Sequence, residues 1–279
     1  MPKIVIATPA YGEMFFTPYV QSLYRLTRAF DERKWSSDFC STSYSDIAES
    51  RNILLTYWYE KTDASHLLFI DADMGFEPKL VLDMIDFNKP VVGVIYPKKK
   101  VDLVRLTQLT RAGEPASRAI ASSHDFVVRR PGRGTFRSGF IEVDGCGTGI
   151  FLIQRSCVDV MLAKIPSVLD VDPKKIPTVT NFGQGGSMAT DFRRFIRAFD
   201  FVTVDGQRLT EDYSFCYRWR HDCGGEVWAN VAYEIIHIGM HRFTARYSDA
   251  HGPRVRVIET PLKKIVEPSP ASQRNFRKT

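Results

Sequence analysis

A nearly continuous apolar run, His66–Ile70, is followed at once by the acidic triplet Asp71-Ala72-Asp73. A short apolar run without polar alternation is typical of a strand that is buried on both faces. Two similar runs, Lys3–Ala7 and Pro90–Tyr96, are separated from it by segments with helical spacing. Strands that alternate with helices in this way predict an α/β fold with a mostly parallel sheet and flanking helices.

Caps and prolines mark the expected helices. Thr17-Pro18 precedes apolar residues at helical spacing, and Asp46-x-x-Glu49 resembles a capping box that opens a helix to about Glu60. A short helix is expected over Pro78–Phe87. The remaining expected strands are Ser37–Ser43, Phe140–Val143, Ile150–Gln154 and the strand-like run Glu226–Ile236.

The expected organisation is a single domain over residues 1–265 with a polar tail over residues 266–279. Two irregular segments interrupt the domain, a basic insertion at residues 98–138 and a glycine-containing loop at residues 166–190. Long loops inside compact domains often carry function. We therefore expect both segments to be mobile and to cover a bound substrate.

Composition narrows the class of protein. Hydrophobic residues make up 44% of the 279 residues, which argues against disorder, and no apolar stretch approaches the ~18 residues of a membrane span. The five cysteines include no Cys-x-x-Cys pair, and the first residues contain no signal-peptide core. These features predict a cytoplasmic protein with neither a disulfide framework nor a zinc site.

Basic residues cluster within a net charge of +6 and would attract phosphates, an anionic membrane or nucleic acid, although such clusters are also common on solvated faces. Within residues 191–201, apolar side chains recur at helical spacing and the arginines fall largely off that stripe. The pattern suits an interfacial helix that attaches weakly to an anionic membrane. It equally suits a helix packed on the sheet.

Ligands of open α/β sheets bind beyond the carboxyl ends of the strands. Thr8-Pro9-Ala10-Tyr11 follows the first strand there, Asp71-Ala72-Asp73 follows another, and a glycine-rich loop spans residues 145–149. Two carboxylates at a buried strand end favour a magnesium or manganese ion that also binds substrate phosphates, although either carboxylate could instead cap a helix. A second triplet, Asp170-Val171-Asp172, precedes Pro173 and is interpreted as a solvated turn.

Two further features remain ambiguous on spacing alone. Glu211 and Asp212 lie at the start of a predicted helix that presents Phe215 and Trp219 on one face, where they serve either the helix cap or catalysis. His237, at the end of an apolar run, is either a core histidine or a metal ligand.

In combination and order, these residues resemble the GT-A class of glycosyltransferases, broadly family 2, from Ile4 to about Gly239. The segments that carry the resemblance are Thr8–Gly12, Glu49–Asn52, Leu67–Asp73, Gly147–Gly149, Glu211-Asp212 and His237–Gly239.

The resemblance implies a role for each of these sites. Thr8, Pro9 and Tyr11, with Ala10, would contact the nucleotide base. Arg51 would hold the nucleoside or diphosphate. Asp71, beside Ala72, would reach the ribose or the metal, while Asp73 and His237 would ligate manganese or magnesium. Asp212 would face the acceptor as the general base of an inverting enzyme, with Glu211 as its substitute. Gly147, Thr148 and Gly149 would lie under the acceptor and donor sugar.

The predicted function is metal-dependent transfer of a sugar from a nucleotide diphosphate to an acceptor such as a glycan, a lipid-linked glycan, a protein or a nucleic acid. Glu-Asp before a helix is commoner in inverting branches and His-x-Gly in retaining ones, so the stereochemistry stays open. One alternative is a sugar-nucleotide nucleotidyltransferase, which should carry a glycine-rich basic loop after the first strand, where this chain has only Gly12. The other is a nucleic-acid-binding or -modifying protein that uses the basic patches.

Overall fold

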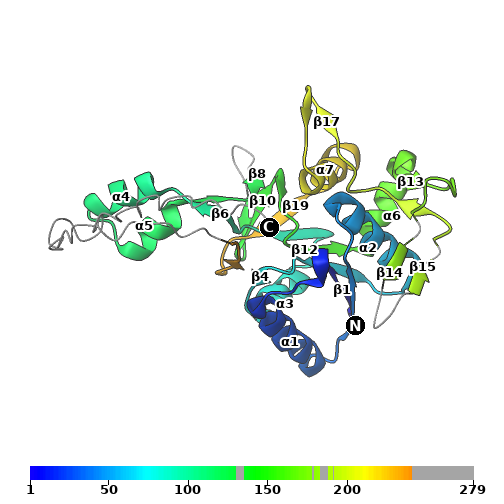
Figure 1. Cartoon of the computed structure of the whole chain (residues 1–279), viewed down its shortest axis with the longest axis horizontal. Helices are drawn as coiled ribbons and strands as arrows, with labels where there is room; N and C mark the ends of the chain where they lie inside the picture. Colours follow the sequence, from blue (N-terminus) through cyan, green and yellow to red (C-terminus); the bar gives the residue numbers. More distant parts are fainter. Residues whose placement is uncertain (130–134, 178, 183–187, 191, 241–279) are drawn as a thin grey trace, which may run out of the picture. The chain divides into compact units, whose positions relative to one another are not determined.

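The computed structural model describes residues 1–129, 135–177, 179–182, 188–190 and 192–240. At its centre is a mixed sheet with the strand order β2-β1-β3-β12-β5-β19-β10-β9 (Figure 1). The strands are β1 (Lys3–Pro9), β2 (Ser36–Thr42), β3 (His66–Ile70), β5 (Val91–Val94), β9 (Phe136–Arg137), β10 (Phe140–Val143), β12 (Ile150–Gln154) and β19 (Val227–Asn230). β2, β1, β3, β5 and β19 run in one direction, whereas β12 and β10 run against them. The α/β fold class expected from the sequence is confirmed.

Helices cover both faces of this sheet (Figure 1). α1 (Thr17–Glu32) and α3 (Pro78–Asp86) pack on one face, and α2 (Ile47–Lys61), α6 (Arg155–Lys164) and α7 (Glu211–Tyr217) pack on the other. Along β3, Leu67 and Phe69 face the core under α2, α6 and α7, whereas Leu68 and Ile70 face the core under α1 and α3. Two-sided burial is therefore the reason for the uninterrupted apolar run in this strand.

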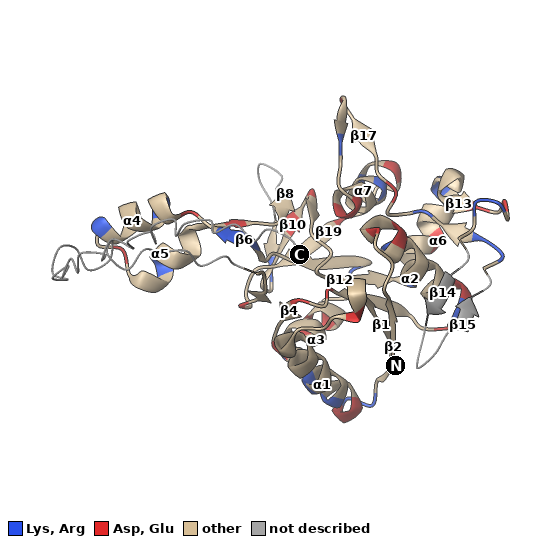
Figure 2. Cartoon of the chain, viewed as in Figure 1, with Lys and Arg blue, Asp and Glu red and all other residues tan. Residues whose placement is uncertain are grey.

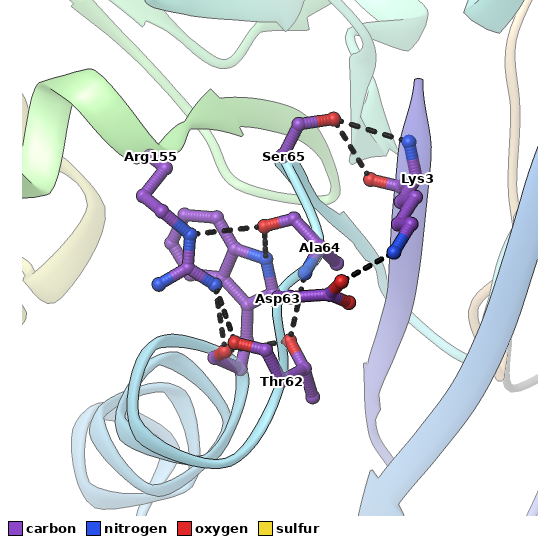
Figure 3. A network of polar contacts seen from close by, with 7 residues as sticks. Lys3, Thr62, Asp63, Ala64, Ser65 and Arg155 are labelled. Atoms are coloured by element: carbon purple, nitrogen blue, oxygen red, sulfur yellow. Dashed lines mark hydrogen bonds and ion pairs between the residues drawn. The ribbon is translucent and has the colours of Figure 1, made fainter. Parts of the chain in front are cut away.

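Polar side chains close both ends of α2. Asp46 caps the start, where its carboxylate accepts a hydrogen bond of 2.9 Å from the backbone N–H of Glu49. At the other end, the guanidinium of Arg155 donates to four backbone carbonyls, among them those of Thr62 and Ala64 (Figure 3). The ammonium of Lys3 pairs with Asp63 beside them, which ties β1 to the loop that leads into β3. These contacts fix α2 and β3, the two elements that supply Arg51 and Asp71.

The insertion at residues 98–138 is not the irregular loop expected from its sequence. It contains a two-stranded ribbon, β6 (Pro97–Val101) with β7 (His124–Phe126), that carries the helical pair α4 (Leu103–Arg111) and α5 (Ala116–Ser122). The strand pair β8 (Val128–Arg129) with β11 (Gly145–Cys146) follows it. Figure 2 shows basic residues along β6, α4 and α5. α4 was not recognised from the sequence although Leu103, Leu106 and Leu109 recur at helical spacing; the helix has only nine residues and none of them is buried.

The helix expected over residues 191–201 is wrong for the residues that the structure describes. Residues 192–201 contain only a short strand, β16 (Phe195–Ile196), which pairs with β13 (Leu169–Asp170). Phe192, Phe195 and Phe199 are buried in the core between α2 and the sheet. These buried rings do not form the exposed apolar stripe that the predicted interfacial helix needs, so the sequence argument for membrane attachment through this stripe is wrong.

The structure also describes the last expected strand, the cysteines and the lengths of the helices. The strand expected over Glu226–Ile236 is divided between β19 and β20 (Ile236–His237), and the latter pairs with β4 (Met74–Gly75). All five cysteines are free and buried. None of the helices in the described ranges is long and apolar enough to cross a bilayer.

Residues 1–239 form one compact unit. The predicted domain end at residue 265 and the tail at residues 266–279 lie outside the described residues, as does part of the loop 166–190. Within that loop the structure describes the short strands β13, β14 (Val179–Phe182) and β15 (Met188–Thr190). Closure of the two segments over a substrate stays a prediction.

Candidate active site

The segments singled out in the sequence meet beyond the carboxyl ends of β1 and β3. The backbone N–H of Asp71 donates to Gly149 O at 2.8 Å, which joins the end of β3 to the glycine-rich loop. The N–H of Phe16, in the loop after β1, donates to Ala72 O at 3.0 Å. This junction is where α/β sheets bind their ligands.

Arg51 lies at the centre of this junction. Its side chain is 3% exposed and donates to both carboxylate oxygens of Asp71, at 3.0 and 3.2 Å. Its Nε lies 3.6 Å from a carboxylate oxygen of Glu211, at the start of α7. Burial raises the pKa of Asp71, and the neighbouring guanidinium opposes that shift. A buried cation thus bridges the two acidic segments predicted to do the chemistry.

Two nitrogens of the Arg51 guanidinium, Nε and the terminal Nη1, are buried and have no hydrogen-bond partner among the described residues, although Nε lies 3.6 Å from Glu211. Arg155 provides a comparison, because each nitrogen of its guanidinium donates to at least one backbone carbonyl. A buried donor without a partner costs free energy, and such groups in folded proteins often mark a ligand site. Arg155 is thus fully bonded to the backbone, whereas Arg51 keeps donor capacity beside Asp71 and Glu211.

Asp73 and His237 form the second part of the site. Antiparallel pairing of β20 with β4 and a hydrogen bond of 3.0 Å from Ile238 N to Asp73 O hold the two residues together. His237 Nε2 lies 3.9 Å from a carboxylate oxygen of Asp73. His237 Nδ1 is 2.7 Å from Pro97 O, and because a carbonyl only accepts, Nδ1 carries the proton.

In the neutral imidazole with its proton on Nδ1, Nε2 is the nitrogen that can ligate a metal, and it lies on the same side as Asp73. No group of three or more His, Cys, Asp and Glu side chains is poised to hold a metal within the described part of the chain. Magnesium-type sites, however, commonly use one or two protein ligands together with water and substrate phosphates. Asp73 and His237 fit such a site, whereas Asp71 is already paired with Arg51.

Asp212 lies in the first turn of α7, near Arg51 and beside Glu211. One of its carboxylate oxygens accepts hydrogen bonds from the Thr210 hydroxyl and from the Tyr213 N–H, the latter at 2.7 Å. Burial and the charge of Glu211 raise the pKa of Asp212. Both hydrogen bonds use the same carboxylate oxygen of Asp212. The other oxygen is therefore left for a chemical role, which is compatible with a role at the start of the helix.

The loop predicted to contact the nucleotide base divides into buried and exposed residues. The Thr8 hydroxyl is buried and lies 2.6 Å from the Tyr19 hydroxyl, so this side chain faces the interior. Ala10 is buried and Pro9 is half-buried, whereas Tyr11 is 70% exposed. Tyr11 is therefore the side chain of this loop that is free to stack on a base.

Tyr96, just after β5, was not recognised from the sequence. Its hydroxyl accepts a hydrogen bond of 3.2 Å from Gly149 N, and its ring packs edge-on against His237 with centroids 5.2 Å apart. A Cβ at Gly147 or Gly149 would collide with the Tyr96 ring or hydroxyl. Close packing against Tyr96 therefore explains why positions 147 and 149 hold glycine. Both glycines and Thr148 are buried.

Replacing Arg51 with methionine should destabilise the fold by about 3 kcal/mol, at the lower end of the range for breaking a buried ion pair, because a quarter of the Asp71 side chain is exposed. The variant leaves Asp71 and Glu211 without their shared cation. Urea unfolding measures the loss. Adding Asp71→Asn to Arg51→Met should recover part of it, and equal stability of the wild type and the single variant would contradict the bridging role.

No protein-family model matches the chain, and no curated protein matches it. Among solved structures, A197 from STIV is similar over 88% of this chain and 99% of its own, at 14% identity and a TM-score of 0.41. S. aureus TarS, in complex with UDP-GlcNAc, covers 87% of this chain at 10% identity and a TM-score of 0.39, and the match spans 60% of its own length. A putative glucose-1-phosphate thymidylyltransferase from Bacillus anthracis covers 60% of this chain and 76% of its own, at 12% identity and a TM-score of 0.32.

The described chain itself has a mixed sheet between two helical layers, with the triplet Asp71-Ala72-Asp73 directly after a central strand of that sheet.

Proposed function

We propose that this protein is a metal-dependent glycosyltransferase that uses a nucleotide-diphosphate sugar as its donor. The observation that carries the proposal is the buried, incompletely paired guanidinium of Arg51 beside the Asp73–His237 pair. A diphosphate is a ligand that would satisfy both, because its oxygens accept hydrogen bonds from arginine and share a divalent cation with a carboxylate.

Each side chain has a distinct task in this proposal. Arg51 donates to a diphosphate oxygen through Nη1, which has no hydrogen-bond partner among the described residues, while Asp71 and Glu211 keep the guanidinium in place. Asp73 and His237 would hold manganese or magnesium, which would stabilise the charge of the departing diphosphate, and the histidine nitrogen favours manganese. Asp212 takes the proton from the attacking acceptor hydroxyl.

Thermal unfolding in the presence of nucleotides tests the proposal. A ligand at about 100 times its Kd stabilises the native state by about 2.7 kcal/mol. One nucleoside diphosphate should raise the Tm in manganese and much less in EDTA, and Arg51→Lys should reduce that rise because lysine lacks the planar fork. If nucleoside triphosphates stabilise the protein and diphosphates do not, the chain is a nucleotidyltransferase instead.

A further inference from the structure

Lys99, on β6, enters the site from the insertion. Its ammonium pairs with the same carboxylate oxygen of Asp73 that faces His237. Two residues earlier on the same strand, the Pro97 carbonyl fixes the orientation of the His237 ring. One short strand therefore controls both of the candidate metal ligands.

The space for Lys99 is built into the chain. A Cβ at Gly239 would lie 2.9 Å from Cδ of Lys99 and 3.2 Å from its Cβ, so the lysine stem packs closely against this glycine and would have to shift for a larger residue. The lysine stem thus fills the space that a side chain at position 239 would occupy. The side chains of Lys99 and Asp73 are 42% and 21% exposed. Ion pairs of this kind contribute little to stability, which leaves the arrangement without a purely structural reason.

Asp73 cannot serve Lys99 and a divalent cation at the same oxygen, because the two cations repel each other. Lysine is a point charge on a flexible four-carbon stem, so its ammonium can turn to another anion without a change in the backbone. When a metal ion and a diphosphate occupy the site, the phosphate oxygens bound to that metal are the anions nearest to the displaced ammonium.

We propose that Lys99 is a phosphate-binding residue of the donor site that exchanges partners, pairing with Asp73 before the metal binds and with the diphosphate afterwards. The proposal rests on the function proposed above and extends it to a residue of the insertion. It also explains why β6 is attached to the site: the insertion delivers a second cation that acts opposite Arg51.

Lys99→Met tests the exchange, with Lys98→Met as the matched control on the same strand, where Lys98 is also exposed. Manganese binding is measured by electron paramagnetic resonance without phosphate, and inorganic pyrophosphate binding by calorimetry in saturating manganese. Lys99→Met should bind manganese about threefold to fivefold more tightly, since it lacks the competing ion pair, whose strength is that of a partly exposed pair. It should bind pyrophosphate about tenfold more weakly, the scale of one lost charge-assisted hydrogen bond.

Lys98→Met should change neither affinity, and Lys99→Arg should retain pyrophosphate binding. Weaker manganese binding by Lys99→Met, or pyrophosphate affinity equal to that of the wild type, overturns the exchange. The same measurements distinguish a failure of the Lys99 exchange from a failure of the proposed function. If the wild type binds manganese and pyrophosphate and Asp73→Asn loses the metal, the donor site stands without Lys99. If the wild type binds no pyrophosphate in manganese, both proposals fall.

Discussion

Asp212→Asn should lower the turnover of sugar transfer by about 10²-fold or more, while the donor continues to bind. The amide occupies the same volume but cannot accept a proton from the acceptor hydroxyl. It can still accept the hydrogen bonds from Thr210 and Tyr213 through its carbonyl oxygen, so α7 should begin at the same residue. A loss of turnover at unchanged Tm therefore separates a catalytic role from helix capping.

The pH dependence gives a second measurement of the same residue. A general base works only when deprotonated, and burial beside Glu211 raises the pKa of Asp212. Activity should therefore fall on the acid side at a pH above the ordinary aspartate value of about 3.9. Asp222→Asn, which changes an exposed carboxylate beyond the end of the same helix, is the control and should leave the profile unchanged. Full turnover in Asp212→Asn with a lowered Tm would assign Asp212 to the cap alone.

The features predicted correctly are those that a short stretch of sequence encodes by itself. The apolar run of β3 requires burial on both faces, whatever packs against it, and the Asp46 cap depends only on residues within one helical turn. The carboxyl end of β3 then places Asp71 and Asp73 where ligands bind. Local pattern and tertiary structure agree at these positions, so the centre of the fold could be derived without coordinates.

The features that were missed depend on contacts between distant segments. Phe192, Phe195 and Phe199 have helical spacing, yet each is buried in the core where the chain forms bends, the short strand β16 and a turn instead of a helix. Tyr96 and Lys99 belong to no sequence motif. Tyr96 contacts Gly149, and Lys99 contacts Asp73 and Gly239, and these partners lie between 26 and 140 positions away in the sequence. A glycine pattern shows that something approaches closely, but not whether it is a substrate or a side chain.

Asp73→Asn should abolish transfer at manganese or magnesium concentrations that saturate the wild type. The neutral amide is a poor ligand for a hard cation, and His237 would remain as the single candidate protein ligand at this position. The Tm without metal should change little, because the ion pair that the substitution breaks, with Lys99, is partly exposed.

His237→Ala is the companion variant, because it removes the nitrogen ligand and leaves the carboxylate. It should raise the manganese concentration needed for half-maximal activity about tenfold or more, which corresponds to about 1.4 kcal/mol. Asp172→Asn is the matched control, since it alters an exposed aspartate of the second Asp-x-Asp triplet and should leave the manganese dependence unchanged. If Asp73→Asn keeps its activity in saturating metal, the transfer does not use this carboxylate. If His237→Ala instead loses stability without metal and keeps its manganese dependence, His237 is a packing residue held by Pro97 and Tyr96.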